Sequence, residues 1–196
     1  MTDSDPHRAL TPEQERTVIE DTQKWLLQAV VCLNLCPFAK AVVVKDMLRY
    51  RVCASTEPAD MLAMLREELQ HLAEADPDKL DTTLLIAPLA LPDFLDFNDF
   101  LADCDEVLMD LELDGVLQVA DFHPRYQFGG TDADDISNHT NRTPYPTLHL
   151  LREASIDKAV QAYPDASHIF ERNIEVLNKL GHAGWHALGI QSRLNA

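Results

Sequence analysis

Hydrophobic residues recur at helical spacing near the start of the chain. Residues 11–14, TPEQ, have the composition of a helix start, because Thr11 can cap, Pro12 suits the first helical position and Gln14 can complete a capping box. The apolar positions that follow are Ile19, Leu26, Val30 and Leu33. Since Pro37 disfavours a helical conformation in the residue before it, the pattern predicts a helix that ends by Leu35 or Cys36.

Strand patterns and helix patterns alternate in the next part of the chain. Residues 49–54 (RYRVCA) alternate polar and apolar positions, while residues 82–87 (TTLLIA) and 116–121 (VLQVAD) are short, largely apolar runs. The segments between them carry apolar residues at helical spacing, and crossover helices join parallel strands. We therefore predict a single α/β domain with a small, mostly parallel sheet. A ferredoxin-like α+β sandwich is the alternative, since a crossover unit with one returning strand has a similar pattern.

The remaining elements complete one domain. Residues 147–151 (TLHLL) predict a fourth strand, and two C-terminal helices follow, one from about Ser155 and one over residues 166–180. Gly181 is suited to a left-handed cap at the end of the second helix. No linker divides the chain, so we predict a flexible N-terminal tail over residues 1–10 and a single domain over residues 11–196.

Composition narrows the class of protein. The 196 residues carry a formal net charge of −17, which repels phosphate backbones and anionic lipid surfaces, so we expect neither a nucleic acid nor a membrane as partner. Acidic residues are dense from residue 57 to residue 114, and we interpret them as two solvated helix faces. Four cysteines are too few for a disulfide scaffold, and the first residues contain no apolar segment of a signal peptide. We expect an acidic cytoplasmic protein, and the pattern leaves its oligomeric state open.

A long polar segment with aromatic residues, 122–146, separates the third and fourth predicted strands. Loops of this length are uncommon unless they are functional or disordered, and its aromatic residues favour order. Asp121, His123 and Arg125 lie where the third strand ends, the edge at which α/β proteins bind ligands. These residues can orient an imidazole beside a guanidinium that binds an anion. A structural pair of Arg125 with Asp121 is the alternative.

From this segment we predict an enzyme that acts on a small anionic molecule, with His123 as acid or base beside Asp121. Arg125, Arg142 and Arg152 are expected to converge in one cleft with His123. The predicted binding residues are Arg125, Tyr126, Asn138, Asn141, Arg142, Tyr145, His149, Arg152 and Glu153. A non-catalytic domain that binds a ligand or a partner protein, and a metal- or thiol-dependent protein, remain alternatives.

Neither a cofactor nor a metal is indicated by a motif. Five residues have side chains that bind metals, and they are Asp121, His123, His139, His149 and Glu153. None of them forms a recognised ligand spacing, so we assign no metal site and leave the cofactor unknown.

Cys36 is the cysteine outside an apolar pattern, in the sequence NLCPFA. It is a candidate nucleophile that a histidine would activate. Cys32, one turn earlier, is interpreted as buried filler. We therefore predict that Cys36 is the most readily modified thiol of the native protein.

Four long segments resemble a bacterial family called domain of unknown function 1415. They are NLCPFAKAV (residues 34–42), HPRYQFGGT (123–131), NRTPYPTLHLLREASID (141–157) and ERNIEVLNKLGHAGW (171–185). The resemblance implies that these polar segments belong to the pattern of the family. It implies no activity and no catalytic residues.

Overall fold

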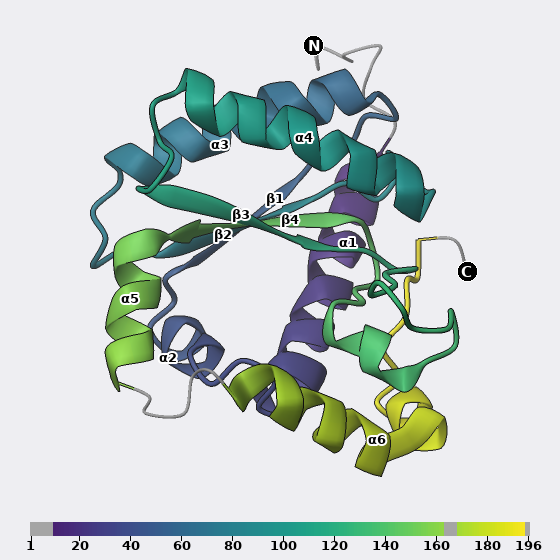
Figure 1. The fold of residues 1–196 in the computed structure, drawn as a ribbon. Helices are drawn as coiled ribbons and strands as arrows, with labels where there is room; N and C mark the ends of the chain where they lie inside the picture. The colour runs from purple at the N-terminus through teal and green to yellow at the C-terminus, as the bar shows by residue number, and fades with distance from the viewer. Residues whose placement is uncertain (1–9, 163–167, 195–196) are drawn as a thin grey trace.

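A four-stranded sheet lies between two groups of helices in the computed structural model, which describes residues 10–162 and 168–194 (Figure 1). Two helices cover one face of the sheet, namely α3 (Pro58–Glu74) and α4 (Phe94–Asp110). The others lie on the opposite side and are α1 (Pro12–Trp25), α2 (Ala39–Val44), α5 (Glu153–Ala162) and α6 (Ile169–Ala187). The chain is thus a single small α/β fold, as the alternation of patterns predicts.

The sheet has the strand order β1-β2-β4-β3. Its strands are β1 (Leu48–Val52), β2 (Thr82–Ile86), β3 (Leu117–Phe122) and β4 (Thr147–Arg152). The pair β1–β2 is parallel, and β4 is antiparallel to both β2 and β3. The three strands joined by crossover helices therefore point the same way, as predicted, but β4 runs against them and makes the sheet mixed. With β4 inserted between β2 and β3, this part is a split βαβ unit, which explains the similarity to a ferredoxin-like pattern.

The first helix begins with the predicted capping box. The Thr11 hydroxyl accepts from the Gln14 backbone N–H at 3.2 Å, and the Thr11 N–H donates to the Gln14 side chain at 2.8 Å. After Trp25 the helix widens into a π-helical segment, η1 (Leu26–Val31), and the helical run ends before Leu35. Wide turns of this kind are frequent at functional sites.

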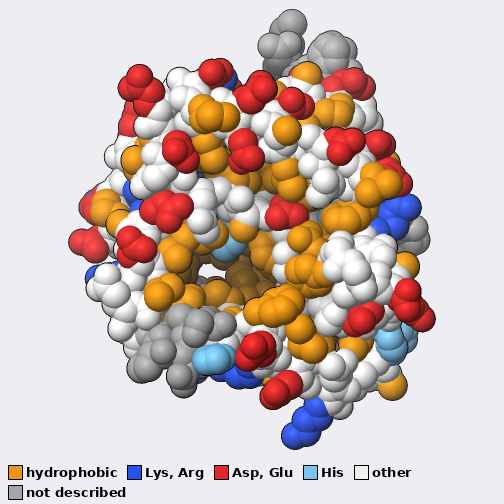
Figure 2. All heavy atoms as spheres, in the orientation of Figure 1, with side chains coloured by type: hydrophobic (Ala, Val, Ile, Leu, Met, Phe, Trp, Pro, Cys, Tyr) orange, Lys and Arg blue, Asp and Glu red, His pale blue; other side chains and the backbone are white. Residues whose placement is uncertain are grey.

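The acidic surface and the larger core both belong to α3 and α4. Leu65, Leu69 and Phe97 are fully buried against the sheet, whereas the acidic residues of α4 are exposed. Figure 2 shows acidic side chains gathered over these two helices, which confirms the solvated helix faces. Glu68 is the exception, because it is 3% exposed and is paired with arginines 49 and 51 of β1. No helix among the described residues is both long enough and apolar enough to cross a membrane.

Gly181 has a positive φ of 63°, as expected of a helix-ending glycine, but its ψ of 173° differs from the predicted left-handed cap, and helical structure resumes after it and continues to Ala187. The residues after α6 are held by Asp21 of α1, which accepts from the Arg193 backbone N–H at 2.8 Å. The predicted flexible tail lies outside the described residues except for Leu10, which is buried. The start of the second predicted C-terminal helix, residues 166–167, also lies outside them.

Candidate functional site

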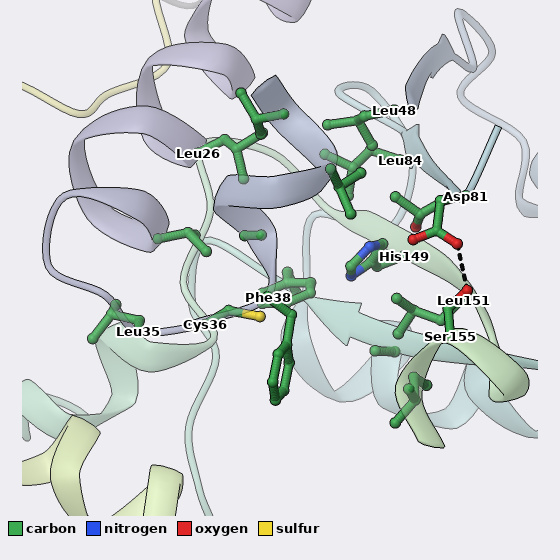
Figure 3. A pocket seen from close by; sticks show the side chains of 18 of the residues that line it. Leu26, Leu35, Cys36, Phe38, Leu48, Asp81, Leu84, His149, Leu151 and Ser155 are labelled. Carbon is green, nitrogen blue, oxygen red and sulfur yellow. Dashed lines mark hydrogen bonds between the residues drawn. The ribbon is translucent and has the colours of Figure 1, made fainter. Parts of the chain in front are cut away.

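A cavity of about 380 Å³ lies on the face of the sheet opposite α3 and α4. The strands form its floor, and its walls come from α1 with η1, from α2 and from α5 (Figure 3). Most of its lining is apolar and includes Trp25, Leu26, Val30, Leu48, Leu84 and Phe122. Figure 2 shows an opening on this side of the molecule surrounded by hydrophobic side chains. Both the volume and the lining are typical of sites that bind small molecules.

The alternation of side chains along the strands directs His149 into this cavity. Its neighbours Leu148 and Leu150 point to the core under α3 and α4, so His149 points to the other face. In the sheet His149 is paired with Leu84 on β2 and with Ala120 on β3. Because Ala120 is small, the floor beside the imidazole is open.

The His149 imidazole is uncharged and has no polar partner among the described residues. Burial lowers the pKa of His149 from 6.5 to about 4, because the protonated form would be removed from water. The Phe122 ring lies 6.1 Å from it, centroid to centroid. A neutral imidazole carries one donor and one acceptor, so His149 can offer both to a molecule in the cavity.

Polar side chains gather at the end of the cavity near α5. The Ser155 hydroxyl donates to Asp81 Oδ1 at 2.5 Å, and Figure 3 shows this bond beside Leu151. The Thr82 hydroxyl donates to the Leu150 carbonyl, also at 2.5 Å. Among the described residues that line the cavity, Asp81 is the charged one.

Cys36 contributes to the wall across from this end, beside Phe38 (Figure 3). It is half-buried, as expected for a thiol that lines a cavity, whereas Cys53 and Cys104 are buried in the core. The interpretation of Cys32 as buried filler is wrong, since Cys32 is exposed.

This exposure changes the expected order of thiol modification. We expect a charged alkylating reagent to label Cys32 before Cys36, because the reagent reaches the surface thiol and is excluded from an apolar cavity. A small uncharged maleimide should reach both thiols. Mass spectrometry of peptides after limited labelling measures the order, and faster labelling of Cys36 by the charged reagent would contradict it.

His123, the predicted acid or base, is fully buried away from the cavity. Its Nε2 lies 3.1 Å from the Leu91 carbonyl, and its Nδ1 accepts from the Arg125 backbone N–H at 3.0 Å. Its ring packs against Phe94 and Phe97, and burial lowers the pKa of the imidazole. Both nitrogens are therefore committed to the backbone, and the geometry makes His123 a support for the turn after β3.

The arginines expected to converge bind backbone carbonyls in three different places. Arg125 contacts the Pro92 carbonyl and lies 3.2 Å from Asp93. Arg142 donates to the Tyr126 carbonyl at 2.9 Å and to the Ala133 carbonyl. The predicted cleft of three arginines beside His123 is therefore wrong, because each guanidinium is bound to backbone carbonyls in a different place and none of the three arginines lines the cavity.

Arg152 illustrates the cause most clearly. Its guanidinium donates to the carbonyls of Leu72 and Ala75 at the end of α3 and to the carbonyl of Leu80. The last carbonyls of a helix have no partner inside the helix and attract cations. Arg152 therefore closes α3 and ties it to β4.

The other predicted residues divide between the loop and the cavity. Asn138 is buried and organises the loop, accepting from the Phe128 N–H at 2.9 Å. Tyr145 donates from its hydroxyl to Asp21 at 2.7 Å. Burial raises the pKa of Asp121, whose carbonyl accepts from Asn141 at 3.3 Å. Three of the predicted residues line the cavity, and they are Cys36, Asn141 and His149.

Tyr126 and Glu153 also lie outside the cavity lining. The Tyr126 ring packs against those of Phe94 and Phe128, each 5.0 Å away between centroids. Glu153 begins α5, and its backbone N–H donates to the Val116 carbonyl. No group of three or more metal-binding side chains occurs among the described residues.

Sequence reasoning missed the polar end of the cavity. Asp81 directly precedes β2, and Ser155 lies in the first turn of α5, but no motif joins two residues so far apart. A signal for His149 was present, because it is the polar residue in the otherwise apolar run LHLL. That alternation shows that His149 lies on the opposite face of the sheet from Leu148 and Leu150, but it does not show that a cavity borders this face.

Comparisons with known proteins give a family and no activity. No curated protein and no solved structure matches the chain. Residues 17–187 match the family described as "Protein of unknown function (DUF1415)", and this range includes η1, the sheet and α5, which surround the cavity. Since the match covers most of the chain, the protein belongs to this family.

Proposed function

We propose that this protein binds a small, largely apolar molecule in the cavity, with His149 as a hydrogen-bonding partner. The observation that carries the proposal is the uncommitted, neutral imidazole in the floor of an apolar cavity of about 380 Å³. A polar group that faces the cavity without a partner in the protein can gain about 0.5–1.5 kcal/mol from a hydrogen bond to a bound molecule. Its apolar part gains about 25 cal/mol for each Å² removed from water.

The arrangement favours this role over an enzyme that acts on a small anion. Such an enzyme needs free cationic groups near a reactive histidine. Arg125, Arg142 and Arg152 are bound to carbonyls, and both nitrogens of His123 are engaged. We therefore adopt the ligand-binding alternative. We retain the cytoplasm as the proposed location from composition, without a nucleic acid or a membrane as partner.

Thiol chemistry at Cys36 is a second candidate, supported by a specific observation. Cys36 and His149 line the same cavity, so a bound molecule can contact both side chains. If this candidate holds, a small uncharged maleimide should modify Cys36 more slowly when the cavity is occupied. Equal rates with and without an occupant would argue against it.

Filling the floor of the cavity tests the proposed function. The uncharged dye N-phenylnaphthylamine becomes fluorescent in apolar surroundings, and we expect the wild-type protein to enhance its emission. Ala120→Leu adds carbon atoms beside His149, in the space a ligand needs. Affinity for the dye should fall by about tenfold or more, a loss of about 1.4 kcal/mol. Fluorescence titration measures it.

Ala102→Leu is the matched control, since it makes the same substitution at an exposed position of α4. It should leave dye binding at the wild-type level, and thermal unfolding should show that both variants are folded. If the wild-type protein does not enhance the dye, or if Ala120→Leu binds it as well as the wild type does, the cavity is not a binding site.

A further inference from the structure

We infer that the ligand of this cavity carries a hydrogen-bond donor at its polar end, with a protonated amine preferred, and that Asp81 binds it. The inference rests on the proposed function and specifies the class of ligand. It depends on two features of the end of the cavity near α5, its hydrogen bonds and its charge, and the start of the helix does not oppose them.

The hydrogen bonds leave acceptors at this end. The Ser155 hydroxyl donates its proton to Asp81 Oδ1, and the Thr82 hydroxyl donates its proton to the Leu150 carbonyl. Both hydroxyl oxygens keep lone pairs but have no proton left to donate. Asp81 Oδ2 accepts no hydrogen bond among the described residues and is acceptor-only when ionised. A ligand group that meets this end therefore finds partners if it donates.

The charge of the cavity agrees with this requirement. Asp81 is acidic, His149 is neutral, and no Lys or Arg occurs among the described residues of the lining. The whole chain has a formal net charge of −17, so its field also attracts cations. A carboxylate or phosphate placed here would face a like charge without a counter-ion, whereas a protonated amine would gain both a hydrogen bond and an opposite charge.

The start of α5 does not reverse this preference. Helix starts attract anions, and Ser155 lies in the first turn of α5. Carboxylates of the chain itself already lie at this helix start, because Asp81 accepts from Ser155 and Glu153 is the first residue of the helix. A second anion would compete with carboxylates that the chain itself provides.

The apolar part of the ligand has a defined direction. In Figure 3 the Asp81–Ser155 pair lies on one side of His149, and Cys36 with Phe38 lies on the other. A molecule whose amine meets Asp81 therefore passes His149 and extends along the apolar walls from η1 and α2. His149 can then contact a second polar group near the middle of the ligand.

Competition between three probes of equal chain length tests the inference. Octylamine, octanol and octanoate are titrated against bound N-phenylnaphthylamine near pH 7. We expect octylamine to displace the dye at a concentration about tenfold or more below that of octanoate, with octanol between them. In Asp81→Asn the advantage of octylamine over octanoate should fall to about threefold or less.

Asp99→Asn is the control for the general attraction of amines to an acidic protein. It removes the same charge from an exposed position of α4, away from the cavity, and should keep the wild-type order. The wild-type series decides independently of any variant.

The failures of the two proposals differ. If the dye does not bind, the proposed function is wrong. If the dye binds but octanoate displaces it as well as octylamine does, the cavity binds ligands and the inference about their polar end is overturned. The same conclusion follows if Asp81→Asn folds and leaves the order of the three probes unchanged.

Discussion

His123→Ala should lower the free energy of unfolding by about 4 kcal/mol. The ring is fully buried between Phe94 and Phe97, so its removal leaves a cavity in the core under α4. It also leaves the Leu91 carbonyl and the Arg125 N–H without their partner. Both effects add, because truncation costs packing and an unpaired buried group costs desolvation. Urea denaturation of the two proteins measures the difference.

His149→Ala is the matched comparison. His149 already lines a cavity and has no polar partner among the described residues, so its truncation should change the free energy of unfolding by about 1 kcal/mol or less. The contrast separates a histidine that supports the fold from one that is available to a ligand. Wild-type stability of His123→Ala would return His123 to the candidate catalytic residues.

The local elements of the fold could be predicted because their signals are local. The capping box of Thr11 and Gln14 lies within four residues, and the strands differ from the helices in the period of their apolar positions. The positive φ of Gly181 also follows from one residue, since glycine adopts it without strain. Such features need no knowledge of which distant segments meet.

The position of β4 could not be predicted, because strand order depends on tertiary packing. The run TLHLL has the same pattern at an edge or in the middle of a sheet. Because β4 lies between β2 and β3, His149 is flanked by Leu84 on one side and by Ala120 on the other. The floor of the cavity therefore depends on the pairing of β4 with β2 and β3, which the sequence pattern of β4 alone does not reveal.

The arginines show the same limit in electrostatics. The net charge suggested a local group of cations, but hydrogen bonds to backbone carbonyls determine where each guanidinium lies. Arg152 reaches Leu72 and Ala75 because α3 ends beside β4, a contact across about 80 positions of sequence. Sequence motifs cannot predict such contacts, because every residue has a backbone carbonyl and residue type does not show which carbonyl an arginine will bind.

Stability should fall as the pH is lowered from 6.5 to about 4, and His149 should account for about 3 kcal/mol of that loss. The pKa of His149 is lowered from 6.5 to about 4 by burial. Above pH 6.5 the ring is neutral in both the folded and the unfolded chain, so it has no effect. Below pH 6.5 the unfolded chain binds the proton first, which favours unfolding, and the loss is complete once the pH is below about 4.

His149→Gln removes the titrating group and keeps a polar side chain in the floor of the cavity. Between pH 6.5 and 4 this variant should lose about 3 kcal/mol less stability than the wild type, as measured by urea denaturation at each pH. Part of the loss should remain, because burial also lowers the pKa of His139 to about 4. His186→Gln, which removes an exposed histidine outside the cavity lining, is the comparison. If the two variants respond equally, the His149 ring is hydrated in solution, and the neutral imidazole that the proposed ligand meets is not there.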